Sequence, residues 1–311
     1  MRKLAMLVGA LAAALLVLVV PAGAITTGQA DGGEHPYVGE LLFFDADAID
    51  SRFDDPGGWF SCSATMLSST VIVTAGHCTY GVGRNGESTT TGGGSGSGGN
   101  DIWFDFDEAA DFNGFPPSSN YARDENHQRY LDRAAWLNAN PHWHRGTAYP
   151  HPQFADGPFY AHDAGVVVLS QAQAMAEYGK IPTLDYINRY AGQPHHLFEV
   201  VGYGLTKSGP FTEEGGDTRL KGDVKLNSLN AALPGAPAGT FIYLSNNPGR
   251  PHQGGTCFGD SGGPTFDDTN SNLVVAVTSF GSSSTCSGVG GAYRLDQLDD
   301  LRFLASFGIT P

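Results

Sequence analysis

Three residues have the types and local contexts that nucleophilic catalysis requires. Ser261 lies in Gly-Asp-Ser-Gly-Gly-Pro, His77 lies in Thr-Ala-Gly-His-Cys, and Asp163 leads into an apolar run. A serine hydroxyl is a poor nucleophile near neutral pH, so it needs a neighbouring imidazole to accept its proton. A buried carboxylate then fixes the tautomer of that imidazole. The pattern predicts a triad with Ser261 as nucleophile, His77 as base and Asp163 as the orienting carboxylate.

The order of these residues along the chain separates three ways of building such a triad. Segment 259–263 also satisfies the Gly-x-Ser-x-Gly pattern of α/β-hydrolases, but their histidine follows the serine, and no histidine follows Ser261. A subtilisin-like triad needs an aspartate before His77, and the aspartates found there lie mostly in polar, turn-rich stretches. Histidine, then aspartate, then serine is the order found in chymotrypsin.

With these motifs and segments 201–206, 279–281 and 291–293, the chain resembles the secreted serine endopeptidases of the chymotrypsin and trypsin family. The resemblance implies an all-β fold of two packed Greek-key β-barrels with a short C-terminal helix. It also implies that peptide bonds are hydrolysed through an acyl-enzyme on Ser261. Two alternatives stay open: a narrow-specificity esterase or processing protease on the same fold, and a non-catalytic binding relative in which a long acidic insertion recruits a partner.

The first 24 residues have the three parts of a secretory signal peptide. Arg2 and Lys3 precede an apolar run over 4–20, and the small residues Ala22 and Ala24 place the cleavage after residue 24. An uncleaved membrane anchor is disfavoured because the apolar run is short for a spanning helix. We therefore expect a secreted, extracellular protein with no stable membrane association after cleavage.

The rest of the chain is expected to form two barrels joined by a crossover. We place the first barrel in 25–170, the crossover in 171–191, and the second barrel with the terminal helix in 192–311. Segment 79–150 is longer than the resemblance implies, and we interpret it as an acidic insertion rich in glycine and serine. Its Gly/Ser run over 89–99 is expected to be mobile, because ordering such a run costs much conformational entropy. Leucines 298, 301 and 304 recur at the spacing of a helix.

Composition limits the partners of the chain. Its formal net charge is −15, which argues against nucleic acid or an anionic membrane as a partner. Glycine accounts for 43 of the 311 residues, and short apolar runs are scattered between turn residues, as in a turn-rich all-β protein. We expect a monomer that acts on a protein or peptide substrate.

Four cysteines in an exported chain predict two disulfides, for which three connectivities are possible. The resemblance implies that Cys62 pairs with Cys78 and that Cys257 pairs with Cys286. The first pair would clamp the His77 turn to the preceding strand. The second would tie the Ser261 loop to the wall that faces the substrate.

The resemblance also implies how the Ser261 loop is activated. The backbone N–H groups of Gly259 and Ser261 would form the oxyanion hole, where a glycine permits close approach. Cleavage after residue 24 would expose the α-amino group of Ile25. Its ammonium would then pair with Asp260 and shape the hole, so that export itself would produce the active enzyme.

The residues that bind substrate come from the same resemblance, which places Gly255 at the base of a specificity pocket. No carboxylate lies at that base, so a large apolar or aromatic residue is favoured over Arg or Lys before the scissile bond. Segment 279–281 would offer a strand edge to the substrate backbone. The residues implied in substrate binding are Gly255, Thr256, Phe258, Ser279, Phe280, Gly281 and Gly291.

Other polar clusters favour structural roles over cofactor chemistry. The carboxylates of 101–108 could hold Ca²⁺, but they lack EF-hand spacing, so a solvated acidic edge is favoured. His142, His144 and His151 lack the spacing of zinc ligands, and the resemblance accounts for His151 without a metal. His162 is interpreted as a residue of the site's rim or as a packing residue. We expect neither a metal nor a cofactor.

Overall fold

The computed structural model describes residues 25–193, 195–247, 253–267 and 272–311. The expected signal peptide, 1–24, lies outside the described residues. Within those ranges, no helix has the length and apolar character needed to cross a bilayer.

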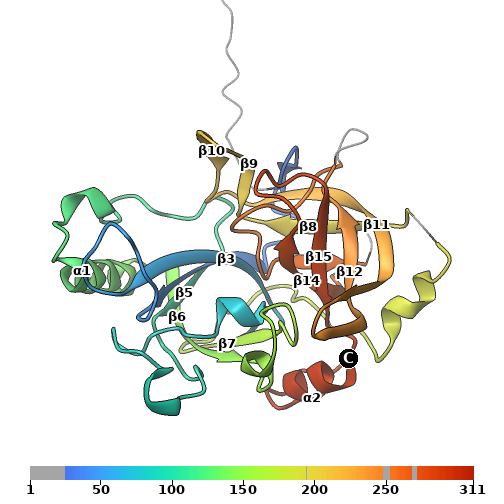
Figure 1. Cartoon of the computed structure of the whole chain (residues 1–311), viewed down its shortest axis with the longest axis horizontal. Coiled ribbons are helices and arrows are strands. Elements are labelled where there is room, and N and C mark those ends of the chain that lie inside the picture. The colour runs from blue at the N-terminus through green and yellow to red at the C-terminus, as the bar shows by residue number, and fades with distance from the viewer. Residues whose placement is uncertain (1–24, 194, 248–252, 268–271) are drawn as a thin grey trace, which may run out of the picture.

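Six antiparallel strands close the first barrel in the order β2-β3-β4-β7-β6-β5 (Figure 1). The apolar runs of β4 and β7 pair directly, with Ile72 opposite Val167, and both side chains are fully buried in the barrel core. The strands are β2 (Val38–Asp45), β3 (Gly58–Met66), β4 (Val71–Thr74), β5 (Ile102–Asp105), β6 (Trp143–Pro150) and β7 (Gly165–Leu169).

The second barrel closes through the pairing of β8 with β11, in the order β11-β12-β15-β14-β13-β8. A separate hairpin, β9–β10, projects from this barrel (Figure 1). Helix α2 (Leu298–Ala305) follows the last strand, so the predicted fold of two barrels with a short C-terminal helix is confirmed. The strands are β8 (Leu197–Gly202), β9 (Leu205–Gly209), β10 (Thr212–Gly215), β11 (Leu220–Leu233), β12 (Ala236–Ser245), β13 (Pro264–Phe266), β14 (Val274–Gly281) and β15 (Val289–Arg294).

Each end of the described chain contacts the barrel at the opposite end of the sequence. Strand β1 (Gln29–Ala30) pairs with β11, with Gln29 opposite Lys221, so the segment from residue 25 lies on the second barrel although we assigned it to the first. Conversely, Phe303 of α2 packs against His151, which follows β6 of the first barrel. Each end therefore fastens one barrel to the other.

The insertion contains a helix that the sequence did not reveal, α1 (Asn126–Ala139). Its buried residues Tyr130, Ala134 and Leu137 join a cluster with Phe44 and Trp103 on the outer face of the first barrel. Five short 3₁₀ turns complete the described elements: η1 (Gly76–Cys78), η2 (Thr91–Gly93), η3 (Ser118–Asn120), η4 (Phe154–Asp156) and η5 (Tyr186–Tyr190).

The Gly/Ser run in the insertion is tied to the barrel rather than free, contrary to our expectation of a mobile loop. The Gly98 N–H donates to the Ala148 carbonyl at 2.8 Å. A Cβ at Gly99 would lie 2.0 Å from the Val82 carbonyl oxygen. Glycine is needed at this position for close backbone approach, which composition alone does not distinguish from flexibility.

Candidate active site

His77 and Asp163 lie side by side because the strands that carry them are paired. His77 lies in η1 just after β4, Asp163 lies two residues before β7, and Thr74 of β4 is opposite Gly165 of β7. The His77 Nδ1 atom lies 3.0 Å from Asp163 Oδ2, and the His77 backbone N–H donates to Asp163 Oδ1 at 2.9 Å. The ring is thus held through Nδ1, and Nε2 has no hydrogen-bond partner among the described residues.

Two opposing effects set the pKa of His77. Burial of the ring disfavours its charged form, but the Asp163 carboxylate and its hydrogen bond outweigh burial and raise the pKa above the usual 6.5. Asp163 itself is fully buried. A buried carboxylate that stabilises the imidazolium suits a histidine that accepts a proton during a reaction.

A second donor reaches Asp163 from the other barrel. The Ser279 hydroxyl of β14 donates to Asp163 Oδ2 at 2.6 Å. Both oxygens of the carboxylate therefore have partners, and its orientation is fixed from both barrels. The sequence placed Ser279 in the substrate strand, and this contact with Asp163 was not anticipated.

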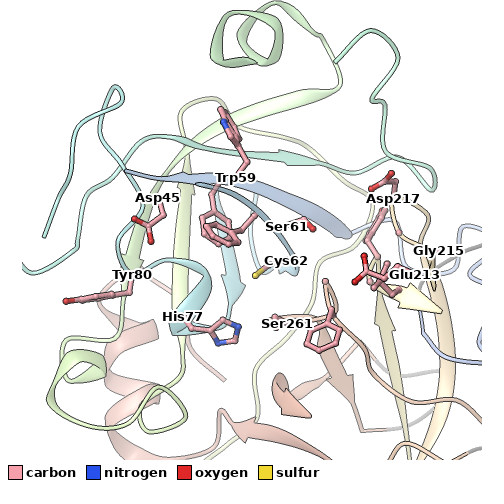
Figure 2. Close-up of a pocket in the computed structure, with 18 residues that line it drawn as sticks. Asp45, Trp59, Ser61, Cys62, His77, Tyr80, Glu213, Gly215, Asp217 and Ser261 are labelled. Carbon is pink, nitrogen blue, oxygen red and sulfur yellow. The ribbon is translucent and has the colours of Figure 1, made fainter. Parts of the chain in front are cut away.

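Ser261 and His77 line one cavity of about 650 Å³. Figure 2 shows the His77 ring extending from its turn toward the segment that carries Ser261. The Ser261 carbonyl accepts the Ser63 N–H at 2.8 Å, which anchors this loop to β3 of the first barrel. The Ser261 hydroxyl makes no hydrogen bond to the His77 ring in the described part of the chain, and such contacts often tighten only when substrate binds.

The backbone around Ser261 leaves two donors free. Gly259 adopts a φ of +94°, and a Cβ there would lie 2.8 Å from the Gly204 Cα. The Ser63 hydroxyl donates to the Gly259 carbonyl at 3.0 Å. Within the described residues, the N–H groups of Gly259 and Ser261 donate to no protein acceptor. Two unpaired backbone donors beside a serine hydroxyl are the arrangement that an oxyanion requires.

Asp260, between those two residues, is fully buried and points away from the cavity into backbone donors. Its carboxylate accepts the N–H groups of Gly204 at 2.9 Å and Cys257 at 2.8 Å, and the Ile25 N–H also contributes. Burial outweighs these bonds and raises the pKa of Asp260 to about 7. Ile25 is itself fully buried, and Thr26 exchanges hydrogen bonds with Gly255. The Ile25 nitrogen thus lies beside a buried carboxylate.

The two disulfides join Cys62 with Cys78 and Cys257 with Cys286, the pairs that the resemblance implied. The first closes a separation of 16 residues next to His77, and the second closes 29 residues around the Ser261 loop. No cysteine in the described ranges is free. Both segments that carry the candidate triad's histidine and serine are therefore covalently braced.

Ser261 also lines a second cavity, of about 430 Å³. Five of the expected substrate-binding residues line it: Thr256, Phe258, Ser279, Phe280 and Gly281. Gly255 and Gly291 do not. Gly255 faces Asn246, and the space beside Gly291 is filled by the Phe280 ring.

We did not predict some of the other residues that line this second cavity. Segment 282–284 directly follows the predicted Gly281, so the motif at 279–281 could have indicated that it lines the cavity. Phe159, in contrast, comes from the distant first barrel. No carboxylate lines the cavity. Its lining is otherwise hydroxyls, a disulfide and aromatic rings.

The acidic residues and histidines that could bind a metal already make hydrogen bonds within the protein. Asp101 accepts from Tyr130 and Arg145, and Asp105 accepts the N–H groups of Asp107 and Asp111, so both carboxylates brace local structure instead of facing an open loop. Two groups of side chains within the described residues have ligand atoms close together: Cys62, His77 and Cys78, and His151, His162 and Asp299.

Some atoms of both groups already take part in other interactions. In the first, both cysteines are consumed by a disulfide. In the second, His151 Nδ1 accepts the Gln153 N–H at 3.2 Å, and His162 Nδ1 lies 3.0 Å from Asp299 Oδ2. One ring nitrogen of His151, Nδ1, therefore already accepts a hydrogen bond from the backbone.

Two comparisons with known proteins found matches. A family model described as Trypsin matches residues 139–300, more than half of the chain. The chain belongs to the trypsin family. Trypsin-family proteins are serine proteases that act on protein or peptide substrates, which assigns this chain to that broad class.

A solved structure described as HL collagenase, one of 797 matching chains, is similar over the whole trypsin-family fold. It has 16% sequence identity and a TM-score of 0.57, and the match covers 94% of this chain and 100% of that one. At this identity the match supports the fold alone. No curated protein matches the sequence.

Proposed function

We propose that this protein is a secreted serine endopeptidase that hydrolyses peptide bonds through an acyl-enzyme on Ser261. The observation that carries the proposal is the chain of hydrogen bonds from Ser279 through Asp163 to His77, because His77 lines the same cavity as Ser261. Within the described residues, the other contacts of Ser261 do not by themselves indicate this role. Family membership supports the same class of chemistry.

In the proposed reaction, the Ser261 oxygen attacks the scissile carbonyl carbon while His77 Nε2 accepts the hydroxyl proton. The resulting imidazolium is stabilised by Asp163, and the carbonyl oxygen gains its negative charge beside the free N–H groups of Gly259 and Ser261. Collapse breaks the C–N bond, and His77 gives its proton to the leaving amine. A water molecule then repeats the sequence on the ester and releases the acid.

The N-terminus is proposed to control the oxyanion hole. With residue 24 attached, the Ile25 nitrogen is a neutral amide beside the buried Asp260. Cleavage after residue 24 converts it to an ammonium, which can pair with the carboxylate and hold the 259–261 loop. Signal-peptide removal during export would then yield the active, monomeric enzyme without a further cleavage.

The second cavity is the proposed site for the side chain before the scissile bond. It lacks a carboxylate, and Phe159, Phe258 and Phe280 contribute aromatic surface. Burying an Arg or Lys there would leave a charge without a partner. We therefore propose a preference for a large apolar or aromatic residue, with the substrate backbone along 279–281.

Steady-state hydrolysis of matched peptides tests this function. Four peptides carry Phe, Leu, Ala or Arg before the scissile bond and are otherwise identical. We expect the mature enzyme to cleave the Phe and Leu peptides best, and Ser261→Ala to abolish turnover. A dominant Arg preference would refute the pocket assignment, and the absence of turnover with correctly folded protein would favour the non-catalytic alternative.

A further inference from the structure

The 650 Å³ cavity beside His77 has an unusual combination of aromatic walls and uncompensated negative charge. Asp45 lies at one side of it, and Glu213 and Asp217 lie at the other, with Trp59 between them (Figure 2). The aromatic lining residues are Phe43, Trp59, Phe60, Tyr80, Tyr203 and Phe258. No lysine or arginine lines the cavity.

None of its three carboxylates has an ion-pair partner among the described residues. The nearby cations are committed elsewhere: Lys207 pairs with Glu214 at 2.7 Å, and Arg219 pairs with Asp31 at 2.9 Å. Burial raises the pKa of Asp217 and that of Asp45. No cation is among the groups that shift either pKa.

The position of the cavity identifies which half of a substrate it faces. It shares only Phe258 and Ser261 with the cavity proposed for the residue before the scissile bond. His77 lines this cavity and not the other. Because His77 protonates the leaving amine in the proposed mechanism, the half of the substrate that leaves must extend into the His77 side.

We propose that this cavity selects substrates with a basic side chain shortly after the scissile bond, through Asp45, Glu213 and Asp217. The inference rests on the proposed endopeptidase function and adds its substrate class. A lysine or arginine lays its aliphatic stem against aromatic rings while its charged head reaches carboxylates. Phe60, which is 47% exposed, offers an open ring for that stem. An acidic residue at the same place would meet like charges.

The two cavities would thus favour side chains of different chemistry on the two sides of the scissile bond. Before the cut, a neutral pocket favours an apolar or aromatic residue. After the cut, an acidic cavity favours a base. The preferred cleavage sites would be junctions between an apolar and a basic residue, and the acidic surface of the whole chain would draw cationic substrates toward them.

Peptides that differ only after the scissile bond test the proposal. All carry Phe before the bond, and Arg, Ala or Glu occupies the first, second or third position after it. We expect kcat/KM to be about tenfold higher for Arg than for Glu at the best position, and the ratio to shrink between low and 0.5 M salt. Equal rates for Arg and Glu peptides that are nevertheless cleaved would overturn the inference and leave the proposed function intact. No cleavage of any peptide would sink the function itself.

Variants assign the preference to residues. Asp45→Asn, Glu213→Gln and Asp217→Asn should together bring the Arg/Glu ratio close to one. Asparagine tolerates the left-handed backbone of Asp217, whose φ is +59°, so this change keeps the loop. The control is Asp124→Asn, which removes one exposed charge that does not line the cavity and should keep the ratio. Because both rates in the ratio are measured on one preparation, partial misfolding lowers both equally and leaves the ratio unchanged. An Arg preference that persists in the triple variant would refute the assignment to these three residues.

Discussion

The Ser279 hydroxyl donates to the buried Asp163 carboxylate at 2.6 Å, from β14 of the second barrel to a loop of the first. The same carboxylate holds the His77 ring and backbone. The orientation of the proposed base therefore depends on how the two barrels dock. The contact between Phe303 and His151 reinforces that docking close to the same loop.

Removal of this hydroxyl should impair the chemical step. In Ser279→Ala, a buried carboxylate loses a charge-assisted donor, and we expect kcat to fall about tenfold with little change in KM. Steady-state kinetics with the Phe peptide measures both. Ser170→Ala, which removes an exposed hydroxyl bound to the Arg145 carbonyl, is the control. An unchanged kcat in Ser279→Ala would contradict this positioning role.

The pH profile should reflect the raised pKa of His77. Protonated His77 cannot accept the Ser261 proton, so kcat/KM must rise with pH as the ring loses its proton. Because Asp163 raises the pKa above 6.5, the acidic limb should lie above pH 6.5. The profile is measured with a neutral peptide, and NMR titration of His77 in Ser261→Ala checks the assignment. A limb at or below pH 6.5 would mean that Asp163 does not dominate the ring's environment.

Asp260 should make the stability of the uncleaved chain depend on pH. Its pKa is about 7 in the fold, above the usual value of 3.8, so folding favours the protonated acid. The free energy of unfolding should therefore fall as pH rises from about 4 to about 7, by at most about 4 kcal/mol. Denaturant unfolding of the uncleaved Ser261→Ala protein measures this.

Two controls isolate that effect. Asp260→Asn should remove the dependence, and cleavage after residue 24 should weaken it, because the new Ile25 ammonium pairs with the carboxylate. Mature protein that carries one additional residue before Ile25 should lose most of its activity. Full activity of the extended protein would exclude control by the N-terminus.

Gly262 should be irreplaceable for packing. A Cβ there would lie 1.9 Å from Thr74 Oγ1 and 2.7 Å from the Ala75 backbone nitrogen, and its φ is +75°. We expect Gly262→Ala to cost more than about 3 kcal/mol of stability, since backbone atoms cannot move aside. Thermal unfolding tests this against Gly281→Ala, whose nearest atom would be 3.8 Å away. Equal melting temperatures would show that the loop adapts.

The sequence predicted the two-barrel fold because the motifs around His77 and Ser261 resemble a known family, and the apolar runs of β4 and β7 predicted buried strands. Helix α1 was not predicted because Arg129 and Arg133 are buried among its apolar residues and obscure the helical pattern. Arg129 is accommodated by Asp50, a partner 79 residues away. No local pattern reveals such a partner.

The substrate cavities show a similar limit. Gly291 was expected on a pocket wall, but the register of β14 against β15 shifts between Thr278 and Phe280, and the Phe280 ring covers Gly291. A bulge of this kind depends on pairing between strands, so it is not encoded in either strand alone. The acidic cavity likewise joins Asp45 and Asp217 from separate barrels.

Covalent labelling by a serine-directed phosphonyl fluoride tests the proposal that Ser261 is a nucleophile activated by His77. We expect one adduct per mature chain, mapped to Ser261 by mass spectrometry, absent in Ser261→Ala and strongly slowed in His77→Ala. Folded mature protein that stays unlabelled, or is labelled equally fast without His77, would contradict it.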